Sequence, residues 1–336
     1  MPAQRKSIPI APVLLVLMTA LVFARWGEAR ERTEPLPSWN GGAAKAAVIS
    51  FVDSVTSGPG ALPPEERIVV TDNDGTLIVE KPRYVQYSFV LDRVRELSWN
   101  SPPWRNSEPY RAIIDGNREI IDSLSGKDAV AIDDTIHEGI TGEAYRAAAA
   151  RWLGTARHPR FSRPYPALVY QPMRELLQYL VSRGFKVYIC SAGSTEFIRA
   201  LAPSAYGIPF ERIIGSEVVT RFTMDDGRPL ITRTSQHMPF VEREYKPLYI
   251  QQRIGRVPVM AIGNSNGDVE MFQYVKGRKG PSMALLLHHD DGDREYCYDG
   301  GAEKALELAG KSGWTTVSMK KDFRKIFPFE KPSERK

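Results

Sequence analysis

Short apolar runs, each followed by small or polar residues, recur along this chain of 336 residues. They lie at residues 68–70, 187–190, 257–262 and 283–287, with a weaker run at 315–319. Continuous apolar runs of this length suit strands that are covered on both faces. Helical spacing of apolar residues appears between them, at 173–181 and 302–309. Strands that alternate with helices predict an α/β fold with a doubly wound, parallel, Rossmann-like sheet.

Two stretches interrupt this alternation. Residues 81–165 include Pro102-Pro103 and an alanine run, and we expect a mostly helical inserted domain there. Residues 213–241 alternate apolar and polar side chains around Asp225-Asp226-Gly227, which predicts a small β-hairpin insertion. The expected organisation is therefore an N-terminal extension at 30–65, with a short helix at 45–55, a core at 66–80 and 166–330, and the helical insertion at 81–165.

The N-terminus resembles an export signal. Arg5 and Lys6 precede an apolar stretch that runs from Ile8 to Ala24, and Ala24 and Ala29 are candidate cleavage positions. An uncleaved N-terminal anchor is the alternative interpretation of residues 1–29. Either interpretation predicts that the body of the protein lies outside the cytoplasm, periplasmic or secreted, and that it meets a membrane only through this segment.

Composition excludes several classes of protein. Hydrophobic residues make up 42% and charged residues 25%, which excludes a disordered chain and a multi-span membrane protein. The net charge is only +5 and no block of five basic residues occurs, so we expect no nucleic-acid partner. Cys190 and Cys297 could pair in an oxidising compartment, but Cys190 ends an apolar run, which favours a buried thiol. The oligomeric state is left open.

Carboxylates follow the first apolar run directly. In open α/β sheets, functional sites form at the carboxyl ends of strands, and Asp72 and Asp74 lie at such a position. Asp72 could serve as a carboxylate nucleophile toward phosphorus. Asp74 could protonate the leaving oxygen and then activate water. The two residues therefore predict phosphoryl-transfer chemistry.

The second run and a nearby lysine supply groups that suit a phosphate. Ser191-Ala192-Gly193 follow this run, and their hydroxyl and main-chain N–H groups could bind phosphate oxygens. Lys246 would neutralise the phosphate and the nucleophile, with Arg221 and Arg253 as alternative cations. We therefore expect a substrate that is a small phosphoester.

Oxygen ligands follow the third run. Asn264 and Asp268 lie there, and with Asp72 and Asp74 they would form a site for Mg²⁺, which prefers carboxylate, amide and phosphate oxygens. A metal ion would be needed because an anionic nucleophile has to approach an anionic phosphate.

Taken in order, these segments resemble the haloacid dehalogenase superfamily, in its phosphatase branch. Asp72-Asn73-Asp74-Gly75-Thr76-Leu77 resembles its first motif, Ser191 the second, Lys246 the third and Gly263-Asn264-Ser265-Asn266-Gly267-Asp268 the fourth. The resemblance covers about residues 67–328. It implies a Mg²⁺-dependent phosphomonoesterase that forms an aspartyl-phosphate on Asp72, with the helical insertion as a cap domain.

The resemblance is greatest to exported bacterial members that are similar to phosphoserine phosphatases. Two departures stand out. Asn264 occupies a position where most members have aspartate. Glu80 lies near the acidic position that phosphoserine-specific members use for the substrate amine, but Lys81 follows it. The sequence therefore does not predict specificity for phosphoserine.

Other interpretations of the motifs remain open. Gly263-Asn264-Ser265-Asn266-Gly267 matches the nucleophile elbow of serine hydrolases, with Ser265 as nucleophile, although no acid and histidine follow in the required order. A non-catalytic exported binding protein on a phosphatase scaffold is a third possibility. His288-His289-Asp290-Asp291 could bind a metal, but adjacent residues of an extended chain point in opposite directions, which favours a surface loop.

Overall fold

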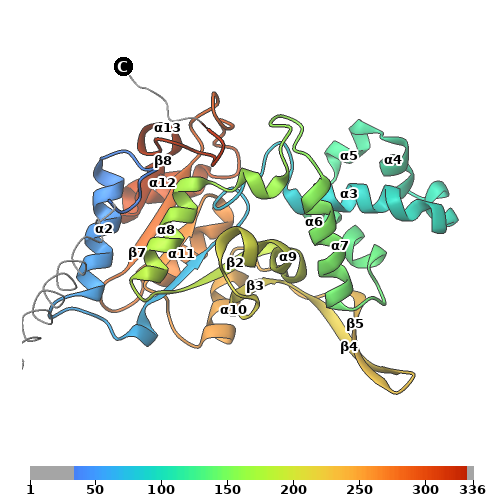
Figure 1. Ribbon diagram of the computed structural model, residues 1–336, viewed down its shortest axis with the longest axis horizontal. Helices are drawn as coiled ribbons and strands as arrows, with labels where there is room; N and C mark the ends of the chain where they lie inside the picture. Colours follow the sequence, from blue (N-terminus) through green and yellow to red (C-terminus); the bar gives the residue numbers. More distant parts are fainter. Residues whose placement is uncertain (1–33, 331–336) are drawn as a thin grey trace, which may run out of the picture. The chain divides into compact units, whose positions relative to one another are not determined.

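The computed structural model describes residues 34–330, and a six-stranded parallel sheet lies at the centre of this part of the chain (Figure 1). Its strand order is β3-β2-β1-β6-β7-β8. The strands are β1 (Ile68–Thr71), β2 (Lys186–Ser194), β3 (Ile213–Ser216), β6 (Met260–Gly263), β7 (Met283–His288) and β8 (Thr315–Ser318). Each of the five apolar runs contributes a strand, so the predicted doubly wound α/β sheet is confirmed.

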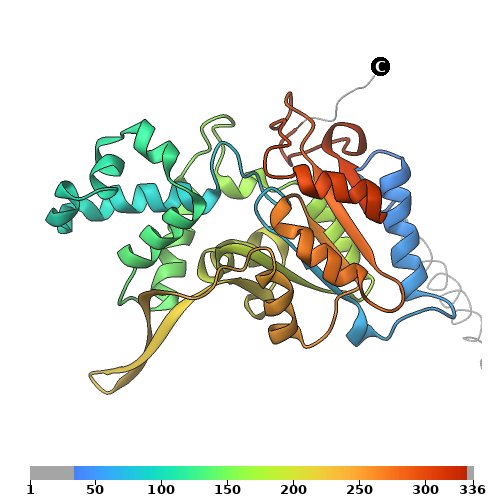
Figure 2. The same ribbon diagram turned by 180° about the vertical axis from the view of Figure 1, so that it is seen from behind.

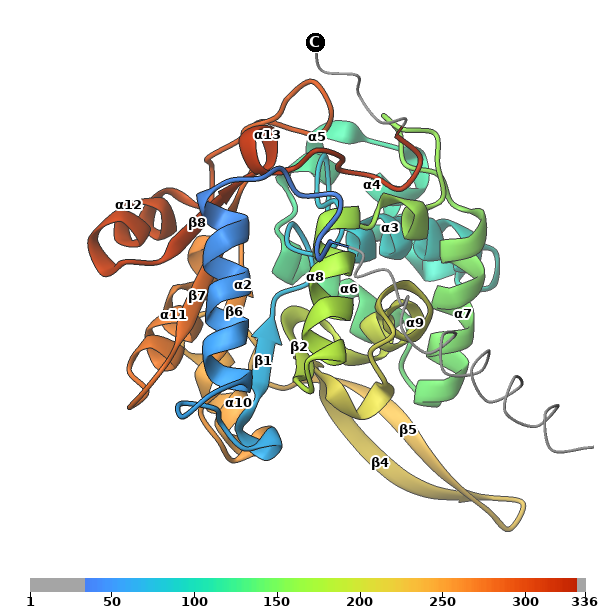
Figure 3. The ribbon, with the colours of Figure 1, turned by 60° about the vertical axis from the view of Figure 1, so that its left-hand side comes forward.

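Helices cover both faces of this sheet (Figures 2 and 3). One layer includes α2 (Ala43–Thr56) and α8 (Gln171–Ser182), and the other is formed by α10 (Tyr245–Ile254), α11 (Val269–Lys276) and α12 (Glu303–Ser312). The short helix expected at 45–55 is the middle of α2. Two further helices, α9 (Thr195–Tyr206) and α13 (Met319–Asp322), follow β2 and β8.

Successive residues of each strand point to opposite faces, which divides the core in two. Val69 and Ile262 pack with α2 and α8 in one cluster, whereas Val70 and Ala261 pack with α10, α11 and α12 in the other. Because both faces are buried, β1 is apolar at every position up to Thr71. The continuous apolar runs of the sequence have this physical origin.

The strand order places a crevice at the carboxyl end of β1. The chain passes from β1 to β2 and β3 on one side of the sheet, then crosses to β6, β7 and β8 on the other side of β1. Open α/β sheets bind ligands at such a switch point, because the loops that leave neighbouring strands separate there. The predicted site residues follow β1, β2 and β6.

The stretch from residue 81 to 165 is helical, as predicted. Its helices are α3 (Val85–Leu97), α4 (Tyr110–Asp115), α5 (Arg118–Ser123), α6 (Gly126–Ile136) and α7 (Gly142–Thr155). Phe89 lies at its centre, stacked on His137 with ring centroids 5.7 Å apart and edge-on to Tyr145 at 5.8 Å. Aromatic packing of this kind gives the insertion a small core of its own.

The predicted hairpin is formed by β4 (Val218–Asp225) and β5 (Arg228–His237), which project from the sheet (Figure 3). Its turn residues Asp226 and Gly227 have φ angles of +45° and +76°, as a two-residue hairpin turn requires. One part of the prediction is wrong: residues 213–216 are not in the hairpin but form β3, an edge strand of the main sheet. Two apolar residues, Ile213 and Ile214, are too short a run to reveal a strand.

The base of the hairpin is joined to the helical insertion. Arg233 exchanges main-chain hydrogen bonds with the α6–α7 connection, accepting from the Gly139 N–H and donating to the Ile140 carbonyl, both at 2.9 Å. Buried Asp134 of α6 also accepts hydrogen bonds from the side chains of Arg233 at 3.0 Å and His237 at 2.7 Å. The two insertions are therefore one connected structure, which the sequence did not indicate.

Both cysteines are free, and Cys190 is buried, as its apolar context predicted, while Cys297 is exposed. The proposed signal peptide or anchor at residues 1–29 lies outside the described residues. None of the helices between residues 34 and 330 is long and apolar enough to cross a membrane.

The packing of the sheet leads to a prediction about stability. Phe272 of α11 is fully buried, with its ring centroid 4.8 Å from that of Trp314. We expect Phe272→Ala to lower the free energy of unfolding by about 3–5 kcal/mol in urea titrations, because it leaves a cavity in the core. Phe222→Ala on the hairpin, where the side chain is 66% exposed, should change it by less than about 0.5 kcal/mol. Equal effects would contradict this division of buried and exposed surface.

Candidate active site

The loop after β1 is a tight turn. The N–H of Leu77 donates to the Asn73 carbonyl at 2.7 Å, and the N–H of Gly75 donates to the Ile78 carbonyl at 2.8 Å. Gly75 has a φ of +71°, and a Cβ there would lie 2.2 Å from Nδ2 of Asn264. Only glycine fits this conformation and this space. The turn brings the carboxyl groups of Asp72 and Asp74 to the wall of one cavity.

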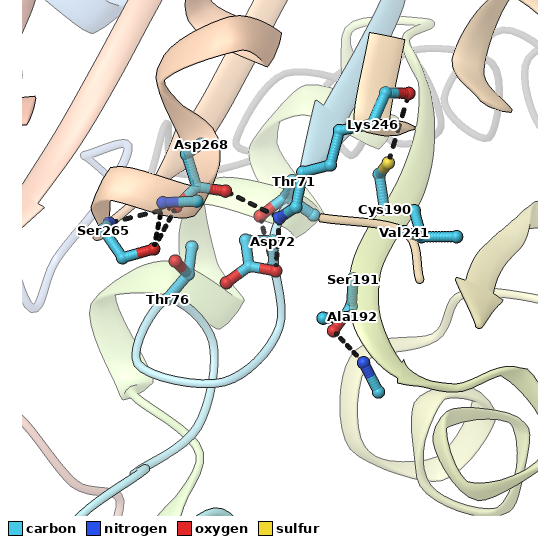
Figure 4. Close-up of polar contacts among 12 residues, drawn as sticks. Thr71, Asp72, Thr76, Cys190, Ser191, Ala192, Val241, Lys246, Ser265 and Asp268 are labelled. Carbon is cyan, nitrogen blue, oxygen red and sulfur yellow. Dashed lines mark hydrogen bonds and ion pairs between the residues drawn. The ribbon is translucent and has the colours of Figure 1, made fainter. Parts of the chain in front are cut away.

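Lys246 of α10 reaches the end of β1 (Figure 4). Its Nζ donates to Oδ1 of Asp72 at 2.8 Å and to Oδ1 of Asp268 at 2.6 Å, and the side chain is 3% exposed. The alternative cations lie elsewhere: Arg221 is exposed on the hairpin, and Arg253 pairs with Glu217 at 2.7 Å. Of the three candidates, the structure brings only Lys246 to Asp72.

Asp268 is fully buried behind this lysine. Its Oδ2 accepts hydrogen bonds from the main-chain N–H groups of Asn264 and Ser265, both at 3.0 Å. A Cβ on Gly263 would lie 2.4 Å from Cγ of Asp268, so a glycine is required where β6 ends. Asp268 therefore fixes the loop after β6 and holds Lys246 at the same time.

Asn264 does not face the cavity. Its Oδ1 accepts from the Thr76 hydroxyl at 2.9 Å, and its Nδ2 is 3.4 Å from Oε1 of Glu80. These contacts tie the loop after β6 to the loop after β1. Neither Asn264 nor Asp268 lines the cavity that Asp72 and Asp74 share.

An irregular loop within the end of β2 completes the cavity wall. The parallel register is interrupted between Cys190 and Ser194, and the Ser191 hydroxyl accepts from the Gly193 N–H at 3.2 Å. The N–H of Ser194 donates to Oε1 of Gln86 at 2.8 Å, and Nε2 of Gln86 donates to buried Asp133 at 2.8 Å. Gln86 thus joins this loop to the helical insertion. No motif marks it, because a single glutamine in a helix has no distinctive sequence context.

The cavity has a volume of about 320 Å³. Six of the predicted site residues line it: Asp72, Asp74, Ser191, Ala192, Gly193 and Lys246. Glu80 and Ser265, which the sequence analysis also named, line it too, but the sequence did not indicate Tyr84, Tyr87, Lys127, Phe240 and Glu242. These come from the helical insertion and from the segment before α10, so only the folded chain brings them together.

The site holds more negative than positive charge. Burial raises the pKa of Asp74 to about 6. Burial also raises the pKa of Asp72, although the ammonium group of Lys246 opposes this. The two carboxylates beside Lys246 raise its pKa, so the lysine keeps its proton. One ammonium group therefore faces three carboxyl groups, those of Asp72, Asp74 and Asp268.

This donor set fits a hard divalent cation. Asp72 and Asp74 present carboxylate oxygens to the cavity. The charge of a metal ion would offset their negative charge, which burial makes unfavourable. Across residues 34–330, no three His, Cys, Asp or Glu side chains converge to form a complete cage. Magnesium tolerates this, because it commonly keeps water and substrate oxygens among its ligands.

The alternative nucleophile, Ser265, lines the cavity but has no histidine beside it. The Ser265 hydroxyl donates to Oδ2 of Asp268 at 3.2 Å and accepts from the Gly267 N–H at 3.1 Å. The chain has five histidines, and the ring partners of each lie elsewhere. The serine-hydrolase interpretation finds no support in this geometry.

The structure of the segment His288-His289-Asp290-Asp291 differs from the prediction. We expected a surface loop, but His289 and Asp291 are buried. His289 points inward, and His288, at the end of β7, pairs with Asp299 at 2.7 Å, so the two rings have different environments. No metal cluster forms here within the described part of the chain.

Comparison with known proteins agrees with this fold. A family model described as haloacid dehalogenase-like hydrolase matches residues 69–273, over half of the chain. A conserved functionally unknown protein from Anaerococcus prevotii DSM 20548 is 16% identical, with 81% of this chain and 91% of that chain covered and a TM-score of 0.54. At this identity the likeness shows the fold alone. The search of curated proteins gives no match.

Two further solved structures have lower scores. A protein of unknown function from Bordetella pertussis Tohama I is 15% identical, with 75% of this chain and 98% of that chain covered and a TM-score of 0.48. A phosphoserine phosphohydrolase-like protein from Francisella tularensis subsp. tularensis SCHU S4 is 17% identical, with 75% and 86% covered and a TM-score of 0.31.

The buried position of Lys246 leads to a prediction that does not depend on activity. Lys246→Met should lower the free energy of unfolding by about 3–5 kcal/mol without divalent metal, because two buried carboxyl groups lose their cation. Arg253→Met removes a half-exposed ion pair and should cost less than about 1 kcal/mol. Chemical denaturation of both variants at neutral pH would measure the difference, and similar values would show that Lys246 is not held as described.

Proposed function

Because the chain belongs to the haloacid dehalogenase-like hydrolase family, we propose that it is a Mg²⁺-dependent phosphomonoesterase that acts on a small phosphorylated metabolite. The observation that carries this proposal is the arrangement of Asp72, Asp74 and Lys246 on one cavity at the carboxyl end of β1. A carboxylate nucleophile, a second carboxyl group with a raised pKa and a fixed cation are the groups that a two-step phosphoryl transfer needs.

The proposed reaction begins with attack by Asp72. A carboxylate oxygen of Asp72 forms a bond to phosphorus while the bond from phosphorus to the leaving oxygen breaks, and Asp74 gives its proton to that oxygen. In the second step Asp74 takes a proton from water. The resulting hydroxide displaces the phosphoryl group from Asp72 as inorganic phosphate. Asp74 is suited to both roles, because burial raises its pKa toward the working range of an acid and base catalyst.

The remaining residues would hold the phosphoryl group. Ser191, Ala192 and Gly193 line the cavity, and the Ser191 hydroxyl and the Ala192 main-chain N–H would donate to the phosphoryl oxygens. The Gly193 N–H would do so after leaving the Ser191 hydroxyl. Lys246 would orient Asp72 and neutralise charge. Mg²⁺, when bound by Asp72 and Asp74, would offset the repulsion between nucleophile and phosphate.

Asn264 and Asp268, also predicted as metal ligands, would serve this site from behind the cavity wall. Asp268 holds Lys246, and Asn264 ties together the loops after β1 and β6. We therefore propose that Asp268 contributes mainly through the lysine, and that any contact between Asn264 and the metal requires its amide to turn from Thr76.

Two finer assignments belong to this proposal. Similarity to the phosphoserine-phosphatase-like branch rests on the four motifs of the sequence. Export to the periplasm or the outside rests on the composition of residues 1–29, with a membrane anchor as the alternative. Neither assignment identifies the substrate.

Hydrolysis of p-nitrophenyl phosphate tests the proposed function. We expect turnover with Mg²⁺, loss of turnover in excess EDTA, and a loss of at least about a thousandfold in Asp72→Asn, because the amide cannot act as the nucleophile. Ser265→Ala serves as the control for the serine-hydrolase alternative and should retain activity. Turnover that resists EDTA and is lost only in Ser265→Ala would refute the proposal.

The charge of the cavity predicts a preference among substrates. Beyond Asp72, Asp74 and Lys246, its charged lining residues are Glu80, Glu242 and Lys127, and Lys127 lies 3.5 Å from Glu242. We expect phosphate esters of neutral or cationic alcohols to be hydrolysed with at least about tenfold higher kcat/KM than esters whose alcohol carries a carboxylate, because like charges repel. Glu242→Gln should reduce this ratio. A preference for anionic alcohols would contradict the prediction.

A further inference from the structure

The proposed reaction does not use the buried His289, yet this residue contacts the loop that carries Asp74. Its Nε2 lies 2.7 Å from the main-chain oxygen of Gly75, and its side chain is 2% exposed. Gly75 follows Asp74 directly, so a hydrogen bond to its carbonyl fixes the peptide beside the proposed acid and base. The histidine comes from the segment after β7, more than two hundred residues along the chain.

The other ring nitrogen of His289 is bonded as well. Nδ1 lies 3.1 Å from Oε2 of Glu295, which is fully buried. Glu295 also accepts from the Tyr170 hydroxyl at 3.1 Å and from the Tyr296 N–H at 2.6 Å. A carbonyl oxygen can only accept a hydrogen bond, so the ring donates from Nε2 to Gly75. The two bonds leave the imidazole with a single orientation.

Tyr298 holds the same loop at a second point. Its ring stacks on that of His289 with centroids 4.5 Å apart, and its hydroxyl donates to Oε1 of Glu80 at 2.6 Å. Glu80 lies five residues after Gly75 and lines the cavity. We refer to His289, Glu295 and Tyr298 as the clamp. It contacts the loop at Gly75 and at Glu80.

Space around the loop is also restricted. A Cβ on Gly75 would lie 2.7 Å from Cδ of Glu80, so the glycine and the glutamate are already packed together. The segment that carries the clamp is anchored in turn. Asp290 accepts from the Lys320 N–H at 2.9 Å, and Arg294 pairs with Asp291 at 2.7 Å. The clamp is therefore supported on the side away from the cavity.

We propose that His289 is a positioning residue that sets the place of the Asp74 carboxyl group through the Gly75 carbonyl, and that Glu295 and Tyr298 hold the ring for this task. The proposal rests on the proposed function, since it assigns Asp74 the proton transfers. Partners that orient a functional group from behind can matter for rate: at metal sites, loss of a residue that orients a ligand typically costs about 10- to 100-fold in metal affinity or activity.

This role has a consequence that a purely structural role lacks. Asp74 has to protonate an alkoxide leaving group, whereas p-nitrophenolate leaves readily without a proton. Hydrolysis of the aspartyl-phosphate also uses Asp74 but is the same step for every substrate, whereas kcat/KM reports the transfer of the phosphoryl group to Asp72. If the clamp positions Asp74, its loss lowers kcat/KM for alkyl phosphates far more than kcat/KM for p-nitrophenyl phosphate. A variant that is merely unstable, or partly unfolded, would lose both activities in the same proportion.

The experiment compares ethyl phosphate with p-nitrophenyl phosphate for variants of the full chain. His289→Leu should lower kcat/KM for ethyl phosphate at least about tenfold, and kcat/KM for p-nitrophenyl phosphate by less than about threefold. His289→Gln, which keeps an N–H near the Gly75 carbonyl, should recover part of the loss. His288→Leu, at the adjacent residue that does not contact the loop, is the matched control and should change neither activity.

Two milder variants keep the test decisive if His289→Leu does not fold. Glu295→Gln and Tyr298→Phe each remove one support while preserving shape, and both should show the same selective loss on ethyl phosphate. Equal losses on the two substrates, or no loss on either, would overturn the positioning role.

A measurement without substrate separates this inference from the proposed function. In wild-type protein with ¹⁵N-labelled histidine, Nε2 of His289 should show the signature of a protonated ring nitrogen, because its partner is a carbonyl oxygen that can only accept. A wild-type ring without a proton on Nε2 would overturn the arrangement of the clamp. If the signature is present but the wild type hydrolyses neither substrate, the proposed function fails, and the assignment of Asp74 fails with it.

Discussion

The buried ammonium group of Lys246 contacts two carboxylates, and this contact holds together the ends of two strands and one helix. Lys246 lies in the first turn of α10, Asp72 directly follows β1, and Asp268 follows β6. The Lys246 ammonium group lies within 2.8 Å of both carboxyl groups. A buried charge is stable only when it is paired and hydrogen-bonded, so the two strands and the helix are constrained to end where they do. The cavity exists because these three ends converge.

Around this contact the loops are packed too closely for ordinary side chains. Gly75 and Gly263 approach Asn264 and Asp268 so nearly that a Cβ at either glycine would collide with them. Asn264, which the sequence predicts as a metal ligand, joins two loops. These loops are tightly packed on one side and border the cavity on the other. This arrangement suits a reaction that depends on the exact positions of the reacting groups, since small displacements of these groups cost much of the rate.

The sequence predicts those parts of the structure that depend on residues close together along the chain. The strands are readable because burial on both faces requires unbroken apolar runs, and Asp72, Asp74 and Ser191 are readable because they follow those runs. Gln86 and His289 could not be predicted in their places, since the contacts of Gln86 with Ser194 and of His289 with Gly75 each span more than a hundred residues and no local pattern records them. The direction of the Asn264 amide likewise depends on Thr76, which only the folded chain brings near.

The hydrogen bonds between the hairpin and the helical insertion have a consequence for how the two can move. Arg233 and Asp134 join β5 to α6 by main-chain and side-chain bonds, while the hairpin leaves the sheet through the short connection at Glu217. If the insertion rotated relative to the sheet, the hairpin would rotate with it. Because displacement grows with distance from the axis, the turn at Asp226 would travel farthest, and a fluorophore attached there would make a small rotation visible as a large one.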